Sequence, residues 1–593
     1  MCVRLRSEKM VRQREKTFGG SACGRYVVAA GLFAAIVVTG FCDVGVFTDS
    51  ESNSKWYGFA LAVAAGGFAT LFFRSSASSG RFRGPALWLL PWFLYGAVRA
   101  ATGPFMLSFA VSCVLFALLC LEVGALVRRQ PFAVLAVPVA ATAALLALYG
   151  IGQWTGWLPP GDRFVVAGNF DNPAGYASML ALSVPFVLYL TVSDRRALRC
   201  AAWGVWVLVA AAVVLSASRA GTVTFVAVTA AYVAKRYGGR WRNVALWKKI
   251  VAAGLAAALA AGLYFAKRDS ADGRLLIWKC TAEMIGDKPW FGHGYRSFEA
   301  EYMRYQARFF ERTPDSRFAP LADNVKHPFN EFLRLAAEFG MAGALWLGLF
   351  VRSAVRAYRR RPDGEAFVFV SVLAGIVVFS CFSYPFSYPF TWFAAAVGTV
   401  GLSVGDGASE SARRGRGGRR FVVAALSLAL AGFTVCGMSF DARWHELACR
   451  GVPGGAETVF PEYERLYPFL KKDPYFVYNY AARANRAGDF GRSATLAAEC
   501  ETMLDDYDVE MLQADNFRRM GDFGRAEERY RLASAMCPGR FMPLYELVNL
   551  YDATGRRDEA DALARVIVLK PAKIPSGTVG AIKMKMEKRL AGE

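Results

Sequence analysis

The chain has 593 residues, of which 55% are hydrophobic, and carries a formal net charge of +22 at pH 7. Apolar runs recur from residue 26 to residue 440, which excludes a soluble globular protein and predicts a polytopic membrane protein. The charge does not indicate a nucleic-acid partner, because Lys and Arg gather in short connectors between the apolar runs. We therefore expect the bilayer, with its anionic headgroups, to be the partner of these connectors. The twelve cysteines show neither a disulfide framework nor a zinc spacing, so we expect no metal site.

Apolar segments of about 20 residues predict an all-α fold with about thirteen membrane-spanning helices. A basic N-terminus, residues 1–25, precedes the first span, which is long enough to cross a bilayer and is expected to be retained rather than cleaved as a signal. The expected spans are 26–47, 57–73, 85–101, 105–126, 132–152, 173–192, 200–216, 221–234, 250–266, 339–355, 366–383, 387–404 and 421–440.

Lys and Arg divide the connectors between these spans into two alternating sets. The positive-inside rule predicts that the basic set is cytoplasmic. The basic clusters lie at 4–25, 74–83, 128–129, 195–199, 235–249, 352–361 and 413–420. The opposite connectors carry little beyond Lys55, Arg99, Arg163 and Arg219. An odd number of spans places the N-terminus in the cytoplasm and the chain after residue 440 on the outer side of the membrane.

The composition after residue 440 becomes that of a soluble helical domain, and it contains a repeat. Three similar segments follow one another at 487–493, 520–526 and 554–560, and their glycines Gly488 and Gly521 lie 33 positions apart. Glycine suits the turn between two helices because it adopts positive φ without strain. This period predicts a tetratricopeptide array within residues 441–593. Such an array presents a concave surface to a protein partner, although a packing scaffold without a ligand is an equally good interpretation.

A polar segment, residues 267–338, interrupts the apolar chain on the expected outer side and holds His293 and His327, two of the three histidines. Arg274 lies near its start, among Gly and Pro residues that indicate a loop of defined shape. His327 precedes an expected helix start at Pro328 and Asn330. A histidine with an ordinary pKa can accept a proton from a hydroxyl at neutral pH. Taken singly, Arg274 can be an ordinary solvated charge and His327 a structural residue.

Arg219 lies on the same side, in the tight turn Ser216–Gly221 between two expected spans. Arginine suits phosphate because its planar fork donates two parallel hydrogen bonds and keeps its charge. The alternative is a side chain that merely reaches up to the headgroups. Two arginines and a histidine on one face offer cations for a diphosphate and a base for an acceptor. A further stretch, residues 168–175, could line a sugar pocket with its amides or cap a helix, and we favour capping.

Several motifs, together and in this order, resemble the O-antigen ligase and polymerase superfamily, which also includes bacterial protein O-oligosaccharyltransferases. The resemblance covers residues 26–440. The motifs are Gly168-Asn-Phe-Asp-Asn-Pro, Ser218-Arg219, Gly273-Arg274, Pro289-Trp-Phe-Gly-His-Gly, His327-Pro-Phe-Asn-Glu and Glu338-Phe-Gly340. The resemblance implies a GT-C-like helical bundle in the bacterial inner membrane. It also implies that a polyprenyl-diphosphate-linked glycan enters from the bilayer and that an acceptor hydroxyl attacks its anomeric carbon in the periplasm, without metal or cofactor.

By motif position, the resemblance implies that Arg219 and Arg274 hold the diphosphate and that His327 is the base. Donor binding is expected to extend to Asn169, Asn172, Asn330 and Lys326. The histidine of the family often stands directly before the asparagine, whereas Phe329 holds that place here and His327 lies two residues earlier. Glu338, beside Phe339 and Gly340, is expected to pack rather than to act in the site.

The acceptor is open to several interpretations. We place ligation to a lipid A-core glycolipid first, glycan polymerisation second and protein O-glycosylation third. The C-terminal array, which plain ligases lack, strengthens the case for protein O-glycosylation, because such arrays commonly bind polypeptides. A different class is a non-catalytic scaffold that recruits envelope-assembly proteins through the array. A transporter is disfavoured, because the polar residues gather at one surface rather than at breaks near the bilayer midplane.

Overall fold

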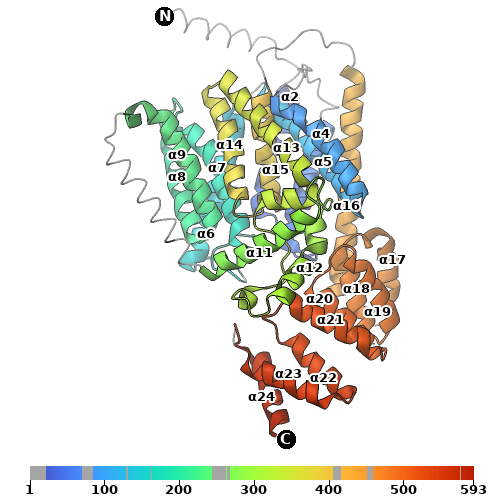
Figure 1. Cartoon of the computed structure of the whole chain (residues 1–593). Helices are drawn as coiled ribbons and strands as arrows, with labels where there is room; N and C mark the ends of the chain where they lie inside the picture. Colours follow the sequence, from blue (N-terminus) through green and yellow to red (C-terminus); the bar gives the residue numbers. More distant parts are fainter. Residues whose placement is uncertain are drawn as a thin grey trace, which may run out of the picture. The chain divides into compact units, whose positions relative to one another are not determined.

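The computed structural model describes residues 22–69, 84–128, 131–161, 163–242, 262, 268–404, 416–449, 459–573 and 576–592. All regular elements within these residues are helices, which confirms the all-α prediction (Figure 1). The chain folds into two compact units. The first unit comprises Met1–Ala97, Leu107–Val244 and Trp346–Ala442, and the second unit comprises Val98–Met106, Ala245–Leu345 and Arg443–Glu593.

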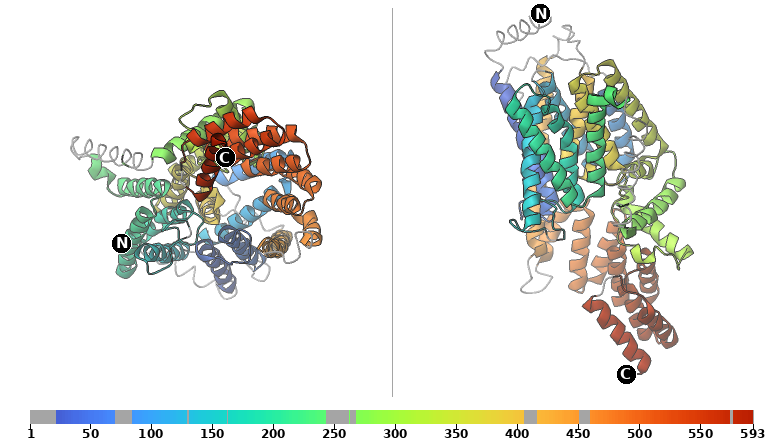
Figure 2. Two further views of the ribbon diagram at one scale, coloured as in Figure 1. Left: turned by 90° about the horizontal axis from the view of Figure 1, so that it is seen from below. Right: turned by 90° about the vertical axis from the view of Figure 1, so that its left-hand side faces the viewer.

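The first unit is a bundle of long apolar helices that run side by side (Figures 1 and 2). Its elements are α2 (Ala22–Phe41), α3 (Ser50–Ala69), η1 (Gly84–Trp88), most of α4 (Leu89–Ala101), α5 (Met106–Val127), α6 (Ala133–Thr155), α7 (Pro173–Leu190), α8 (Arg196–Leu215), α9 (Arg219–Arg242), the second half of α13 (Glu331–Arg360), α14 (Gly364–Ser380), η3 (Pro385–Ser387), α15 (Pro389–Ser403) and most of α16 (Arg416–Cys449).

Six of the described helices are long and apolar enough to cross a membrane, which supports a multi-pass membrane protein. They are Met106–Val127, Ala133–Thr155, Pro173–Leu190, Arg196–Leu215, Glu331–Arg360 and Arg420–Cys449. The expected span 250–266 lies outside the described residues, except for residue 262. Helices lie at the other expected spans, several of them shorter or more polar than a typical span. The count of thirteen therefore stays a prediction.

Helix α7 lies at the centre of the first unit, because nearly all of its side chains are buried. Its Phe186 packs parallel to Phe132, with ring centres 5.7 Å apart. Helix α9 approaches α7 so closely that a Cβ on Gly221 would lie 2.6 Å from the Cβ of Ala177. This contact fixes the start of α9, and with it Arg219, against the central helix.

The second unit joins the polar segment to the C-terminal helices. Its elements are α11 (Arg268–Asp287), α12 (Ser297–Arg312), η2 (Ala319–Leu321), the start of α13, and the C-terminal helices α17 (Phe460–Leu470), α18 (Pro474–Arg486), α19 (Phe490–Glu501), α20 (Tyr507–Arg519), α21 (Phe523–Met536), α22 (Met542–Ala553), α23 (Arg557–Leu569) and α24 (Gly577–Ala591). One buried cluster combines Met284, Tyr302 and Phe310 of the polar segment with Tyr507 and Met536 of the C-terminal helices.

Successive C-terminal helices pack against one another from α18 to α24, as Figure 2 shows in orange to red. The chain turns with positive φ at Gly488, Gly521 and Gly555, the glycines of the sequence repeat. Aspartate side chains cap the helices α18 to α21 by accepting hydrogen bonds from free backbone N–H groups. Helix pairs thus recur at the period of the sequence, and their assignment as tetratricopeptide repeats stays a prediction.

Candidate functional site

Two of the glycine motifs form one backbone junction in the second unit. The N–H of His293 donates to the carbonyl oxygen of Ala337 at 2.8 Å. In the opposite direction, the N–H of Met341 donates to the carbonyl oxygen of Pro289, also at 2.8 Å. Gly340 has φ +63° and interrupts α13, and a Cβ there would lie 2.5 Å from the backbone carbon of Trp290. Only glycine satisfies both the left-handed conformation and this close approach. The junction therefore fixes the loop before α12 to α13 at its Gly340 kink.

His293 is held inside this junction by both ring nitrogens. Its Nδ1 lies 2.7 Å from Oε2 of Glu301, and its Nε2 lies 2.8 Å from the carbonyl oxygen of Met284. The side chain is only 2% exposed. A buried imidazole with both ring nitrogens engaged suits a structural role, and His327 stays the histidine predicted to be the base.

Arg274 lies on helix α11, so the loop expected around it is wrong, and the loop begins only after that helix, at residues 288–296. Arg274 and the segment that contains His327 come together on one side of α11. The guanidinium carbon of Arg274 lies 5.0 Å from the centre of the Phe329 ring. One turn further along α11, Trp278 donates its indole N–H to the carbonyl of Pro328 at 3.0 Å. Asn330 caps α13, because its side-chain oxygen accepts from the N–H of Phe332 at 2.9 Å. This cap agrees with the helix start expected at Asn330.

The environment of His327 keeps its imidazole neutral. Burial, followed by the positive charges of Arg334, Arg296 and Lys326, lowers the pKa of His327 to about 4, although the charge of Glu299 acts in the opposite direction. A neutral imidazole is the form that accepts a proton, so His327 is in the protonation state that a base needs at neutral pH.

Glu299 remains ionised beside this histidine. Burial alone would raise the pKa of Glu299, but the positive charge of Arg296 and a hydrogen bond from Tyr475 outweigh it and lower the pKa to about 2. The Arg296 guanidinium donates to Oε2 at 2.8 Å, and the Tyr475 hydroxyl donates to Oε1 at 2.6 Å. Tyr475 belongs to α18, so a C-terminal helix contributes directly to the surroundings of His327.

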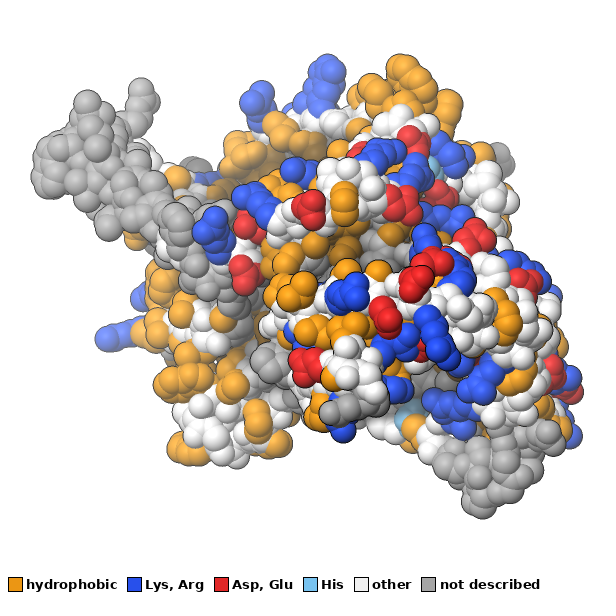
Figure 3. Space-filling model, turned by 60° about the horizontal axis from the view of Figure 1, so that its bottom comes forward, with side chains coloured by type: hydrophobic (Ala, Val, Ile, Leu, Met, Phe, Trp, Pro, Cys, Tyr) orange, Lys and Arg blue, Asp and Glu red, His pale blue; other side chains and the backbone are white. Residues whose placement is uncertain are grey.

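Lys326 and Glu338 each have a charged partner within the second unit. Lys326 pairs with Asp506 of the C-terminal helices. Glu338, only 4% exposed, accepts from Arg334 at 3.0 Å, which agrees with the packing role expected for it. On the face that Figure 3 shows, Lys and Arg side chains (blue) lie interspersed with Asp and Glu side chains (red). The polar segment and the C-terminal helices are thus joined by charge pairs as well as by a common core.

Arg219 lies in the first unit, at the first turn of α9. The preceding turn is tight, because Ala217 adopts a positive φ of 52°. The Ser218 hydroxyl accepts from the N–H of Gly221 at 3.3 Å, as a helix cap does. The start of a helix favours anions through its free N–H groups and its dipole, and the guanidinium of Arg219 adds a full positive charge there.

The amides of Asn169 and Asn172 also lie in the first unit, and both contact the protein. Asn172 caps α7, accepting from the N–H of Ala174 at 2.8 Å, which confirms the capping interpretation. Its amide nitrogen lies 2.9 Å from the hydroxyls of both Tyr384 and Tyr388. Asn169 donates to the carbonyl of residue 41 at 3.3 Å. A role for either amide in donor binding stays a prediction.

Several residues that contact these sites lie outside the motifs of the superfamily. Lys55 is buried at 1% exposure and donates to the carbonyl of Asn169. The two tyrosines beside Asn172 come from a tandem Ser-Tyr-Pro-Phe at 383–390, a duplication that the sequence displays. Tyr475 and Asp506 had no comparable signal, because their partners lie more than 170 positions away.

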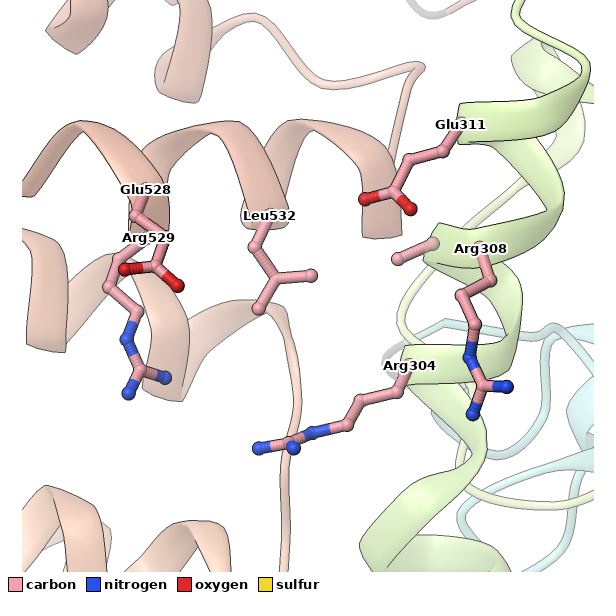
Figure 4. A pocket seen from close by; sticks show the side chains of 7 residues that line it. Arg304, Arg308, Glu311, Glu528, Arg529 and Leu532 are labelled. Carbon is pink, nitrogen blue, oxygen red and sulfur yellow. The ribbon is translucent and has the colours of Figure 1, made fainter. Parts of the chain in front are cut away.

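The C-terminal helices and α12 also enclose a groove of about 390 Å³. Figure 4 shows the side chains that line it from two helices, among them Arg304 and Arg308 on α12 and Arg529 and Leu532 on α21. Each arginine has a carboxylate partner: Arg304 pairs with Asp505, Arg308 lies 3.6 Å from Asp287, and Arg529 lies 2.9 Å from Glu510. The groove contains none of the predicted site residues, and its cations are neutralised within the protein.

The six apolar helices indicate a multi-pass membrane protein, and in its polar segment Arg274 lies beside Phe329, two residues after His327. Comparison with protein families finds that residues 176–348 match the O-antigen ligase family. The match supports a place in the O-antigen ligase superfamily of membrane glycosyltransferases, whose members transfer lipid-linked glycans. A comparison with curated proteins finds no match.

Proposed function

We propose that this protein transfers a polyprenyl-diphosphate-linked glycan to an acceptor hydroxyl at the periplasmic face of a bacterial inner membrane. The observation that carries the proposal is that the matched region, residues 176–348, contains Arg219, Arg274 and His327 together. The orientation follows from the basic connectors expected in the cytoplasm. The chain after residue 440, with its array of repeats, is proposed to be periplasmic.

In the proposed reaction, the acceptor oxygen forms a bond to the anomeric carbon while the bond from that carbon to the diphosphate oxygen breaks. Polyprenyl diphosphate leaves with the electron pair, and Arg219 and Arg274 neutralise its charge in place of a metal. Such stabilisation is commonly worth about 3 kcal/mol per well-placed donor. His327 takes the proton of the acceptor hydroxyl. Because an imidazole of low pKa is a weak base, the proton moves after formation of the carbon–oxygen bond has begun.

A glycolipid of the lipid A-core type remains the first acceptor to test, followed by the growing glycan itself and by a protein. Protein acceptance is supported by the C-terminal array, since such arrays commonly bind polypeptides. The second unit joins this array to the polar segment that carries His327. An acceptor bound by the array would accordingly be held by the same compact unit as the candidate base.

The test is a transfer assay with purified protein in lipid nanodiscs, a polyprenyl-diphosphate glycan and the three acceptors in separate reactions. We expect Arg219→Ala, Arg274→Ala and His327→Ala to lose transfer while keeping the melting temperature of the wild type. Arg312→Ala is the matched control, because Arg312 belongs to the same polar segment but its side chain is 64% exposed. Wild-type transfer by the Arg274 variant would remove that residue from the diphosphate site.

A further inference from the structure

The segment that leads to His327 is held by an acidic turn of the C-terminal helices, residues 505–508. Asp506 pairs with Lys326, and its Oδ2 also accepts from the amide of Asn324 at 3.2 Å. Asp508 accepts from the same amide at 3.0 Å. The side chain of Asp506 is only 4% exposed. The residues immediately before His327 are thus fixed by partners from the C-terminal helices.

The two carboxylate oxygens of Asp506 have separate tasks. Oδ1 caps α20 by accepting from the N–H groups of Asp508 and Val509, both at 3.0 Å. Oδ2 is the atom that contacts Lys326 and Asn324. Asparagine at this position keeps an oxygen for the cap and loses the charge and the second acceptor. The chain therefore offers a substitution that separates the helix cap from the contact with the His327 segment.

A second contact from the C-terminal helices acts on Glu299. Asp473 caps α18 by accepting from the N–H of Tyr475 at 2.9 Å, which fixes the first turn of that helix. From there the Tyr475 hydroxyl reaches Oε1 of Glu299, whose other oxygen is bound by Arg296. Lys326 also lies over the Tyr475 ring, 6.0 Å from its centre. One aromatic side chain thus faces both the Glu299 carboxylate and the residue next to His327.

We propose that Asp506 and Tyr475 are positioning residues of the transfer site, through which the C-terminal helices hold His327 and Glu299 in the geometry for transfer. The inference rests on the proposed function. It assigns the C-terminal helices an internal role that is independent of any external protein partner. It also assigns Lys326 to the contact with Asp506 rather than to the diphosphate.

The first test is a double-mutant cycle on Lys326 and Asp506, with kcat and KM measured for donor and acceptor. We expect Lys326→Met and Asp506→Asn each to lower kcat about tenfold or more, because small displacements of reacting groups are costly. The double variant is expected to be no slower than the slower single variant, since both changes remove the same contact. If the loss of kcat in the double variant equals the product of the two single losses, and Lys326→Met also raises the donor KM, then the assignment of Lys326 to the contact with Asp506 is wrong.

Conservative variants keep the test decisive if a charge-removing variant folds poorly. Lys326→Arg keeps a positive charge within reach of Asp506 and is expected to retain most of the wild-type kcat. Tyr475→Phe removes only the hydroxyl and is expected to lower kcat several-fold, with an unchanged melting temperature and donor KM. The matched controls are Asp522→Asn and Tyr545→Phe. Asp522 caps α21 as Asp506 caps α20, and the Tyr545 hydroxyl accepts a hydrogen bond from Lys585.

The outcomes for the inference and for the proposed function are distinct. Wild-type kcat in both Asp506→Asn and Tyr475→Phe, beside an active wild-type protein, would overturn the inference alone. Losses of the same size in the two control variants would also overturn it, since they would show a general effect of altering the C-terminal helices. Absence of transfer by the wild-type protein with every acceptor would overturn the proposed function and the inference with it.

Discussion

Arg274 packs its guanidinium over the ring of Phe329, with 5.0 Å between the guanidinium carbon and the ring centre. The residue that departs from the superfamily pattern is therefore a direct neighbour of the proposed diphosphate ligand. An aromatic face attracts a cation without neutralising it, so the guanidinium keeps its charge for an anion. Phe329 in this way supports Arg274 at the position where a histidine is often found.

Replacing Phe329 by Leu is expected to weaken donor binding, because the aliphatic side chain keeps bulk but loses the π face. A loss of about 0.5–1 kcal/mol corresponds to a two- to fivefold lower kcat/KM for the donor. Phe329→Tyr keeps the π face and is expected to stay close to the wild type. Steady-state kinetics with varied donor measures both variants. Equal losses in Leu and Tyr variants would show that shape, rather than the cation–π contact, matters.

Alanine at Gly340 is expected to disrupt the junction between the polar segment and α13. The added Cβ would lie 2.5 Å from the Trp290 backbone, and the positive φ of 63° adds strain. Gly348→Ala in the same helix is the matched control, because no atom lies within 4 Å of its added Cβ. We expect a clear fall in melting temperature and in transfer for Gly340→Ala only. A stable, active Gly340→Ala protein would show that the junction is adaptable.

Local chemistry made part of this site predictable from the sequence. Asn330 caps α13, as expected for a residue at a helix start, and Glu338 is buried beside Arg334, in agreement with the packing expected from its place next to Phe339 and Gly340. The contacts of Tyr475 and Asp506 were not predictable, because a charge pair between distant segments leaves no periodicity in the chain. The helix start expected near Asn330 and the apolar span expected from residue 339 belong to one helix, α13, which is kinked at Gly340. The sequence pattern did not show that they are continuous, because the first turns of α13 are polar.

The low pKa of His327 predicts the pH dependence of transfer. With a pKa of about 4, His327 is neutral above about pH 5, so kcat/KM should be flat from pH 6 to 8 and should fall as the pH approaches 4. The positive charge of Lys326 contributes to this low pKa, so Lys326→Met is expected to raise the pKa and move the acidic limb toward neutral pH. A wild-type limb near pH 6.5 would instead indicate a solvated histidine.

The same shift predicts how folding stability varies with pH. The folded-state pKa of His327 is below the ordinary value near 6.5, so between these values the unfolded chain binds more protons than the folded protein. This group therefore contributes stability above pH 6.5 that is lost as the pH falls toward 4. His327→Gln is expected to weaken the pH dependence of the melting temperature in that window. An unchanged slope would argue against a buried, neutral His327.

Removing the C-terminal helices is expected to destabilise the polar segment. Residues Tyr507, Ala533 and Met536 are buried in one cluster with side chains of α11 and α12, so a chain ending at residue 455 would expose that cluster to water. Size-exclusion chromatography of the solubilised protein should show aggregation. Removing only residues 574–593 is the control, because α24 packs on α23 at the end of the array. A monodisperse, active truncation at 455 would contradict the common core.

Asn172 can be assigned to capping or to glycan binding by comparing three substitutions. Asn172→Ala removes the α7 cap and is expected to cost about 1 kcal/mol of stability. Asn172→Ser keeps a capping oxygen but cannot reach Tyr384 and Tyr388 as the amide does, and Asn172→Asp keeps the oxygen but loses the donor. If capping is the main role, the melting temperature falls for Ala and stays near wild type for Ser, with donor KM unchanged throughout. A donor KM that rises in all three variants, at constant melting temperature, would instead assign the Asn172 amide to the glycan.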